Sequence, residues 1–184
     1  MESRSVNIHE ALISQCRTGN RQAQFELYRL YHKAMYNVAL RICNDREEAE
    51  DALQESFVSA FGHLDQYRGD SSFGSWLKRI VINKSLNLLR KKNQWVVLQE
   101  ELPDSGYYEW EDVPDHRLTL EQVKKSINLL PAGFRTVLSL YLFEGYDHKE
   151  IGQIMDISES TSKSQYNRAK KKLREIMCKD VKYG

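Results

Sequence analysis

Apolar residues recur at intervals of three or four positions along most of the chain, which is the spacing of one face of an α-helix. Residues 21–43 show this spacing over six turns, with Leu27, Tyr31, Ala34, Val38 and Ile42 on one predicted face. The same spacing predicts further helices at residues 118–130, 132–143, 147–155 and 159–178, one that ends near residue 61, and one at about 73–92. The pattern therefore predicts an all-α protein.

Polar caps and helix breakers stand at the predicted helix ends. Asp45 and Asp147 each precede a glutamate by three residues, Glu48 and Glu150, which is the spacing of a capping box. Ser158 is a favourable N-cap residue for the last helix. Further breaks are predicted at Gly19-Asn20, at Pro131 and at Gly145, the last in a left-handed cap.

Some stretches lack the helical spacing. Residues 63–72 form a polar loop that contains Arg68-Gly69-Asp70, and residues 95–98 are strand-like but too short to found a sheet. Residues 99–115 combine proline, glycine and acidic residues, which is typical of a linker that repels itself and stays extended. We therefore predict two small helical domains, at residues 8–95 and 117–180, joined by an acidic flexible linker at 96–116.

The charge is distributed unevenly although the net charge is only +1. Residues 71–99 contain no acid and six bases, and residues 160–174 repeat this composition. Residues 100–115 carry seven acids and no base, and a second acidic cluster lies at residues 45–55. Two concentrated basic stretches in separate predicted domains favour a protein that binds the phosphates of nucleic acid.

Composition narrows the class of protein further. Hydrophobic residues make up 41% and charged residues 29%, as in soluble globular proteins. No apolar run approaches the roughly 18 residues of a membrane span, and the N-terminus lacks the apolar segment of a signal peptide. We therefore expect a cytoplasmic protein without membrane insertion. Because Cys16, Cys43, Cys178 and the five histidines lack metal or redox spacing, we expect free thiols, no metal and no cofactor.

The last two predicted helices have the pattern of a helix-turn-helix, whose second helix enters the DNA major groove. Ile151, Ile154 and Ile157 are placed to share a core. The longer helix begins with small residues, which let the backbone approach DNA, and continues with longer polar ones, which reach base edges and phosphates. The residues that fit this description are Ser160, Thr161, Ser162, Lys163, Ser164, Gln165, Asn167 and Arg168.

The C-terminal motifs resemble region 4 of bacterial RNA polymerase sigma factors. The residues that carry this resemblance are Leu130-Pro131, Arg135, Leu138, Leu140, Glu144-Gly145, Glu150-Ile151-Gly152, Ile157-Ser158, Lys163-Ser164 and the run Arg168-Ala169-Lys170-Lys171-Lys172-Leu173-Arg174. Region 4 of that family reads the promoter element near position −35. The chain departs from the family at Ser162 and Gln165, where valine and arginine are common, so the resemblance does not define the −35 sequence.

The N-terminal half resembles region 2 of the same family. The run Glu48-Ala49-Glu50-Asp51-Ala52-Leu53-Gln54-Glu55-Ser56-Phe57 resembles the helix that docks on the polymerase clamp. The segment Tyr67-Arg68-Gly69-Asp70-Ser71-Ser72-Phe73, with Trp76-Leu77-Lys78-Arg79-Ile80 and Asn83, resembles the part that melts the promoter and reads the −10 element. The absence of a region 3 is typical of the small extracytoplasmic-function (ECF) class.

The resemblance implies a sigma factor that binds the β and β′ subunits of core RNA polymerase, recognises promoter DNA as duplex and as melted strand, and has no catalytic activity. We expect Glu48, Asp51, Gln54 and Glu55 to dock on core polymerase. We expect Tyr67, Arg68, Asn83, Lys84 and Asn87 to hold −10 DNA, where an aromatic ring and a guanidinium support an unstacked base. Trp76 and Leu77 are expected in the core. Lys163, Ser164, Asn167 and Arg168 form one helical stripe that is expected to read the −35 element, with Lys170 and Lys171 on phosphates.

Two alternatives belong to other classes. A stand-alone helix-turn-helix regulator would account for residues 147–178 but not for the acidic docking helix or the Arg-Gly-Asp loop. A nucleic-acid enzyme would need a metal cluster, a nucleophile motif or a glycine-rich phosphate loop, and none is recognisable. The sequence leaves open whether an anti-sigma factor or a recruiting protein binds the chain. The family alone suggests that the acidic linker enters the RNA-exit path of polymerase and mimics nucleic acid.

Overall fold

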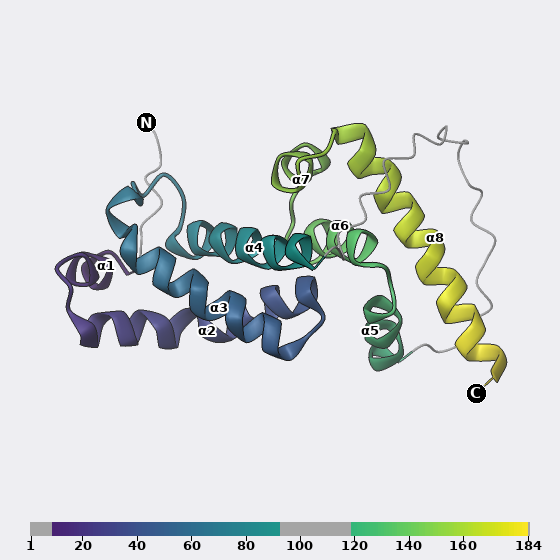
Figure 1. The fold of residues 1–184 in the computed structure, drawn as a ribbon, viewed down its shortest axis with the longest axis horizontal. Coiled ribbons are helices and arrows are strands. Elements are labelled where there is room, and N and C mark those ends of the chain that lie inside the picture. Colours follow the sequence, from purple (N-terminus) through teal and green to yellow (C-terminus); the bar gives the residue numbers. More distant parts are fainter. Residues whose placement is uncertain (1–8, 93–118, 184) are drawn as a thin grey trace. The chain divides into compact units, whose positions relative to one another are not determined.

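The computed structural model describes residues 9–92 and 119–183, with side chains described up to residue 178, and these residues belong to two compact helical units (Figure 1). The units divide after Lys92. The expected all-α architecture of two helical domains is confirmed, and the described residues contain no strand. The predicted linker and the strand-like run at 95–98 lie outside the described residues.

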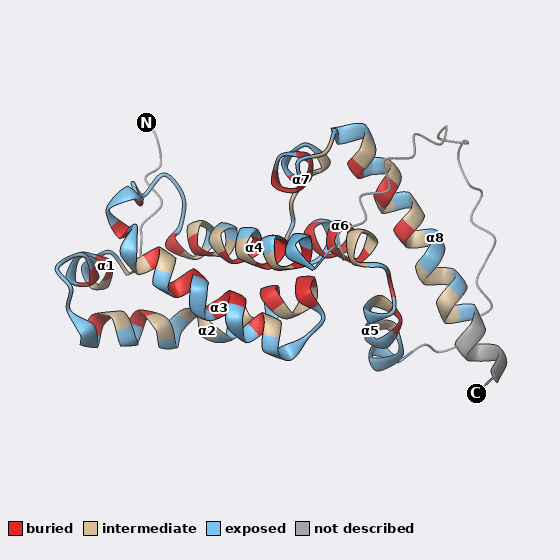
Figure 2. Ribbon diagram, viewed as in Figure 1, coloured by how far each residue is buried: buried red, intermediate tan, exposed pale blue. Residues whose placement is uncertain are grey.

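The first unit is built on three helices that pack against one another: α2 (Arg21–Cys43), α3 (Arg46–Gly62) and α4 (Phe73–Lys91). Each buries one stripe of its surface against the other two (Figure 2). Burial of each large apolar side chain contributes about 1.5–3 kcal/mol relative to exposure. The largest fully buried side chains of this core are Leu27, Ile42, Phe73, Leu77, Val81, Ile82, Leu86 and Leu89.

A further helix, α1 (Glu10–Arg17), precedes these three and was not predicted from the sequence. It has eight residues and buries only Ile13 and Cys16, so its apolar pattern is too short to show a period. It packs against α2 and against a single 3-10 turn, Leu64–Gln66, that follows α3.

Side chains cap the helices of the first unit at the predicted breaks, but only half of the predicted capping box forms. The Asn20 side chain accepts hydrogen bonds from the backbone of Gln22 and Ala23 at the start of α2, and Asp45 accepts from Glu48 N at 3.0 Å at the start of α3. The reciprocal half of the predicted box at α3 does not form, because the Glu48 carboxylate instead pairs with Lys92 beyond the end of α4.

The second unit comprises α5 (Leu120–Asn128), α6 (Ala132–Leu142), α7 (His148–Met155) and α8 (Glu159–Tyr183). The long α8 packs against each of the other three helices. Its Ala169 contacts the buried Leu130 and Leu138, and Leu173 and Ile176 extend the same apolar stripe. This single helix therefore organises the unit.

The helix-turn-helix is formed by α7 and α8. Asp147 and Glu150 make the predicted capping box of α7, and Ser158 Oγ accepts from Thr161 N at 3.0 Å at the start of α8. The turn between the two helices passes very close to Gly152 of α7. A methyl group at this position would lie only 2.8 Å from the carbonyl oxygen of Ile157. A side chain at this position would force the two helices apart.

Candidate nucleic-acid interface

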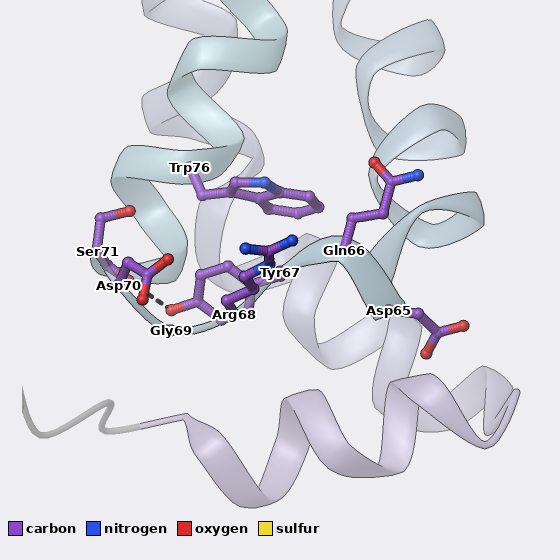
Figure 3. A pocket seen from close by; sticks show the side chains of 8 residues that line it. All are labelled: Asp65, Gln66, Tyr67, Arg68, Gly69, Asp70, Ser71 and Trp76. Carbon is purple, nitrogen blue, oxygen red and sulfur yellow. Dashed lines mark hydrogen bonds between the residues drawn. The ribbon is translucent and has the colours of Figure 1, made fainter.

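The loop after α3 and the start of α4 enclose an open pocket of about 610 Å³ (Figure 3). Gly69 adopts a left-handed conformation, φ 82°, that favours glycine and turns the chain around the pocket. Trp76, expected in the core, is only half-buried, and its ring lies over the loop. The pocket is lined by Asp65, Gln66, Tyr67, Arg68, Gly69, Asp70, Ser71 and Trp76.

Tyr67 lies in the core and not on the loop surface. Its side chain is 4% exposed, its ring centroid lies 5.6 Å from that of Phe73, and its hydroxyl donates to the Ser71 carbonyl oxygen at 2.7 Å. A base stacks only on an accessible ring face. In this structure Phe73 and Trp76 cover the Tyr67 ring, so the ring does not offer a free face to a base. The exposed side chain of Arg68 and the indole of Trp76 are the groups that a base could meet.

The outer stripe of α4 is polar and basic. Asn83 and Asn87, one turn apart, are both exposed as predicted. Arg79 lies one turn before Asn83 on the same exposed stripe, and the i, i+4 spacing could have indicated it. Lys84 is half-buried beside the stripe, and its Nζ lies 3.5 Å from a carboxylate oxygen of Glu55 on α3.

The acidic face of α3 consists of Asp51, Gln54 and Glu55, all exposed. Val58, at the next turn of the same face, is 75% exposed, and sequence reasoning missed it because an apolar residue at helical spacing is usually core. Glu48 lies on the same side of α3, at i−3 from Asp51, but its side chain is only 12% exposed and pairs with Lys92. In this structure the Glu48 carboxylate is therefore less available to a partner than those of Asp51 and Glu55.

The buried side of α8 fixes which of its polar residues face outward. Ser162 and Gln165, which the sequence placed among the candidate DNA contacts, are buried with Ala169. Lys163, Asn167 and Lys171 follow at i, i+4 and i+8 and are exposed, whereas Ser164, Arg168 and Lys170 are half-buried beside them. Lys163 pairs with Glu159 at 2.7 Å, and Lys170 lies 4.7 Å from the centroid of the Tyr166 ring.

A polar and aromatic cluster joins α6, α7 and α8 behind this stripe. The His148 ring is stacked on Tyr141, with centroids 4.7 Å apart, and meets Tyr166 edge-on at 5.5 Å. Its Nδ1 is hydrogen-bonded to the buried Ser162 hydroxyl at 3.0 Å. Burial lowers the pKa of His148, and the nearby Lys163 lowers it further. The cluster therefore holds α8 against α7 with an imidazole that favours its neutral form.

The described residues hold no group of three His, Cys, Asp or Glu side chains placed as a metal site requires, and Cys16, Cys43 and Cys178 are free thiols. Within the same residues, no helix is both long and apolar enough to cross a membrane.

Both units match one protein family. The Sigma-70 region 2 model matches residues 27–95, and the Sigma-70, region 4 model matches residues 120–173. The ECF RNA polymerase sigma factor SigM of Bacillus subtilis is 30% identical over 157 residues, which cover 85% of this chain and 96% of SigM. The RNA polymerase sigma-H factor of Pseudomonas aeruginosa is 28% identical over 172 residues, covering 88% of this chain and 89% of that protein.

Two solved structures share the fold. CnrH, solved in complex with the cytosolic domain of CnrY, has a TM-score of 0.56 and 23% identity, covering 92% of this chain and 97% of CnrH. The sigma factor RpoE of Bartonella quintana, solved with the anti-sigma factor NepR, has a TM-score of 0.57 and 23% identity, covering 83% of this chain and 94% of RpoE.

The chain therefore belongs to the sigma-70 family, within its ECF group of RNA polymerase sigma factors. It is a promoter-directing subunit that acts with core RNA polymerase. The alternative of a stand-alone helix-turn-helix regulator is not favoured. Such a regulator needs only the second unit and does not account for the region 2 match in the first unit.

The lowered pKa of His148 predicts a pH-dependent stability of the second unit. The neutral imidazole is favoured in the folded state, so its stabilising contribution is complete above the ordinary histidine pKa of about 6.5 and is lost as the pH falls through the lowered value. We expect His148→Phe, which can retain the stack on Tyr141, to reduce the drop in melting temperature between about pH 7.5 and about pH 5.5. The measurement is thermal unfolding of the full chain at both pH values.

A matched control is His32→Phe in the first unit, because His32 is likewise stacked on a tyrosine, Tyr28, with centroids 5.1 Å apart. In this variant the pH dependence that arises from His148 should persist, because the stack of His148 on Tyr141 and its bond to Ser162 are untouched. An equal pH dependence in the wild-type chain and His148→Phe would contradict the assignment.

Proposed function

We propose that this ECF sigma factor works through three surfaces of its own residues, each with a different partner, and without a catalytic step. The acidic face of α3 docks on core RNA polymerase. The pocket beside Trp76 and the outer stripe of α4 hold the melted −10 strand. The outer stripe of α8 reads the −35 duplex. The site of action is the cytoplasm, where the polymerase is. An anti-sigma factor is a proposed further partner, since the related RpoE was solved with NepR.

The observation that carries the proposal is the stripe of Lys163, Asn167 and Lys171 on the second helix of a helix-turn-helix. A recognition helix must present donors along one side while its other side is held by the domain. Burial of Ser162, Gln165 and Ala169 holds that other side. Lysine donors match guanine, and an asparagine amide matches adenine. The stripe therefore has the chemistry for base readout as well as for phosphate binding.

The polymerase surface is supported by the composition of the α3 face. Asp51, Gln54 and Glu55 occupy the turns of α3 just before the exposed Val58, so a carboxylate-rich surface borders an exposed apolar side chain. Protein interfaces commonly combine an apolar anchor with a polar rim. The Glu55–Lys84 pair places this face next to the proposed DNA stripe of α4. Because the Glu55–Lys84 pair is partly exposed to solvent, it adds little stability to the fold. Its effect is to orient the two side chains relative to each other.

The strand-binding surface is supported by the residues around the pocket. Arg68 and Trp76 offer a guanidinium and a half-exposed ring, the two groups on which unpaired bases stack. Arg79, Asn83 and Asn87 continue away from the pocket along α4. An amide and basic track of this kind suits a flexible phosphate backbone. Tyr67 then serves as a wall of the pocket and not as a stacking platform.

Reversing charge on the α3 face should weaken polymerase binding. We expect Asp51→Arg with Gln54→Arg to lower the affinity for core polymerase by about tenfold or more, since a carboxylate and an amide that face basic groups become cations. Glu55 is left in place so that its pair with Lys84 persists. The measurement is equilibrium binding of labelled chain to core polymerase.

The control for this variant adds the same charge elsewhere in the first unit. Gln22→Arg with Glu26→Arg changes an exposed amide and an exposed carboxylate of α2 and should bind core polymerase like the wild type. Equal affinities for both double variants would show that α3 is not the docking face.

Alanine variants of the α8 stripe should separate base reading from phosphate binding. We expect Lys163→Ala and Asn167→Ala each to cost about 1–3 kcal/mol on the preferred sequence and to relax preference at one −35 position. Lys171→Ala should weaken all sequences alike and lower the salt slope by about one unit. The measurement is a binding selection over randomised −35 duplexes.

Lys171→Ala is also the control here, because, like Lys163→Ala, it removes one positive charge from the same stripe. If Lys163→Ala and Asn167→Ala lower affinity uniformly, as Lys171→Ala does, the stripe is an electrostatic anchor and the specificity assignment is wrong.

A further inference from the structure

Helix α1 contributes the side chain of Arg17 to the pocket segment, and Arg17 lies outside the residues matched by the family model. The region 2 match begins at residue 27, whereas α1 ends at Arg17. Arg17 donates from Nη2 to the Tyr67 carbonyl oxygen at 2.6 Å and from Nε to the Leu64 carbonyl oxygen at 3.4 Å. The two partners are 50 and 47 residues away along the chain. One guanidinium therefore binds both ends of the segment that leads into the pocket.

This contact suits arginine in particular. The guanidinium has five N–H donors in a planar fork, so two neighbouring carbonyl oxygens can be bound at once. A lysine ammonium is a single point donor on a flexible stem and cannot reproduce that geometry. Hydrogen bonds from a charged donor are also stronger than neutral ones.

Tyr67 is consequently held by hydrogen bonds at its backbone and at its side-chain hydroxyl. Its carbonyl oxygen is bound by Arg17, and its hydroxyl donates to the Ser71 carbonyl oxygen at 2.7 Å. Its ring is covered by Phe73 and Trp76. The next residue is Arg68, whose side chain lines the pocket together with that of Trp76 (Figure 3). Fixing the backbone of Tyr67 fixes the point from which Arg68 enters the pocket.

We propose that Arg17 is a positioning residue for the melted −10 strand, which it never touches. It holds the segment from Leu64 to Tyr67 so that the pocket has its shape before a base arrives. A preformed pocket avoids the cost of ordering the loop on binding. The inference rests on the proposed function of the pocket, and it adds α1 to the elements that set −10 selectivity.

The test compares Arg17→Ala and Arg17→Lys in the full chain bound to core polymerase. The probe is a set of single-stranded −10 oligonucleotides in which each position is changed in turn. We expect Arg17→Ala to lose about tenfold in affinity for the preferred strand and to flatten the ratios between bases. Arg17→Lys should also lose affinity for the preferred strand and flatten the ratios between bases, because one point donor cannot bind both carbonyl oxygens. Arg21→Ala, which removes an exposed cation from the start of α2, should match the wild type.

Two further readouts separate positioning from folding. Binding to core polymerase and to a −35 duplex should be unchanged in both Arg17 variants. Unchanged base ratios in both variants overturn the inference, and so does an equal loss of polymerase, duplex and strand binding, which is the mark of a general folding defect.

Arg68→Ala separates failure of this inference from failure of the proposed pocket. If Arg68→Ala alters the base ratios and Arg17→Ala does not, Arg17 has no positioning role although the pocket binds the strand. If neither variant alters them, the proposed function of the pocket fails together with the inference.

Discussion

Burial of one stripe of each long helix is the constraint on which the rest of this structure depends. In α4, burial of Leu77, Val81 and Ile82 against α2 and α3 leaves Arg79, Asn83 and Asn87 facing outward. In α8, burial of Ser162, Gln165 and Ala169 leaves Lys163, Asn167 and Lys171 outward. Because a helix repeats every 3.6 residues, fixing the inner stripe fixes the outer one. The nucleic-acid chemistry of the chain is therefore set by how its cores pack.

Buried hydroxyls have different partners in the two units. In the first unit, Ser56 and Ser85 donate to carbonyl oxygens of their own helices, whereas Ser162 of the helix-turn-helix is hydrogen-bonded to His148 on α7. Burying a polar group costs free energy unless it has a partner. The pairing makes the angle between α7 and α8 depend on a directional bond as well as on apolar contact. The close approach of Gly152, one turn after His148, to the backbone of Ile157 restricts the same angle.

Much of this could be predicted from the sequence where the signal was local. The predicted helix at 21–43 coincides with α2, and the boxed cap of α7 and the left-handed Gly145 formed as expected. The differences came from tertiary contacts that helical spacing does not show. Glu48 pairs with Lys92, which is 44 residues away, and the ring of Phe73, which begins the next long helix, helps to bury Tyr67. Helix α1 is too short to show a period, so Arg17 could not be connected with the pocket.

The central claim is that this chain directs core RNA polymerase to promoters, and run-off transcription tests it most directly. Purified chain is added to core polymerase on a library of genomic fragments, and transcript start sites are mapped with and without the chain. The account predicts new start sites at a constant distance downstream of one shared pair of −35 and −10 sequences. Start sites identical to those of core polymerase alone, with the chain bound to duplex DNA independently of polymerase, would contradict it.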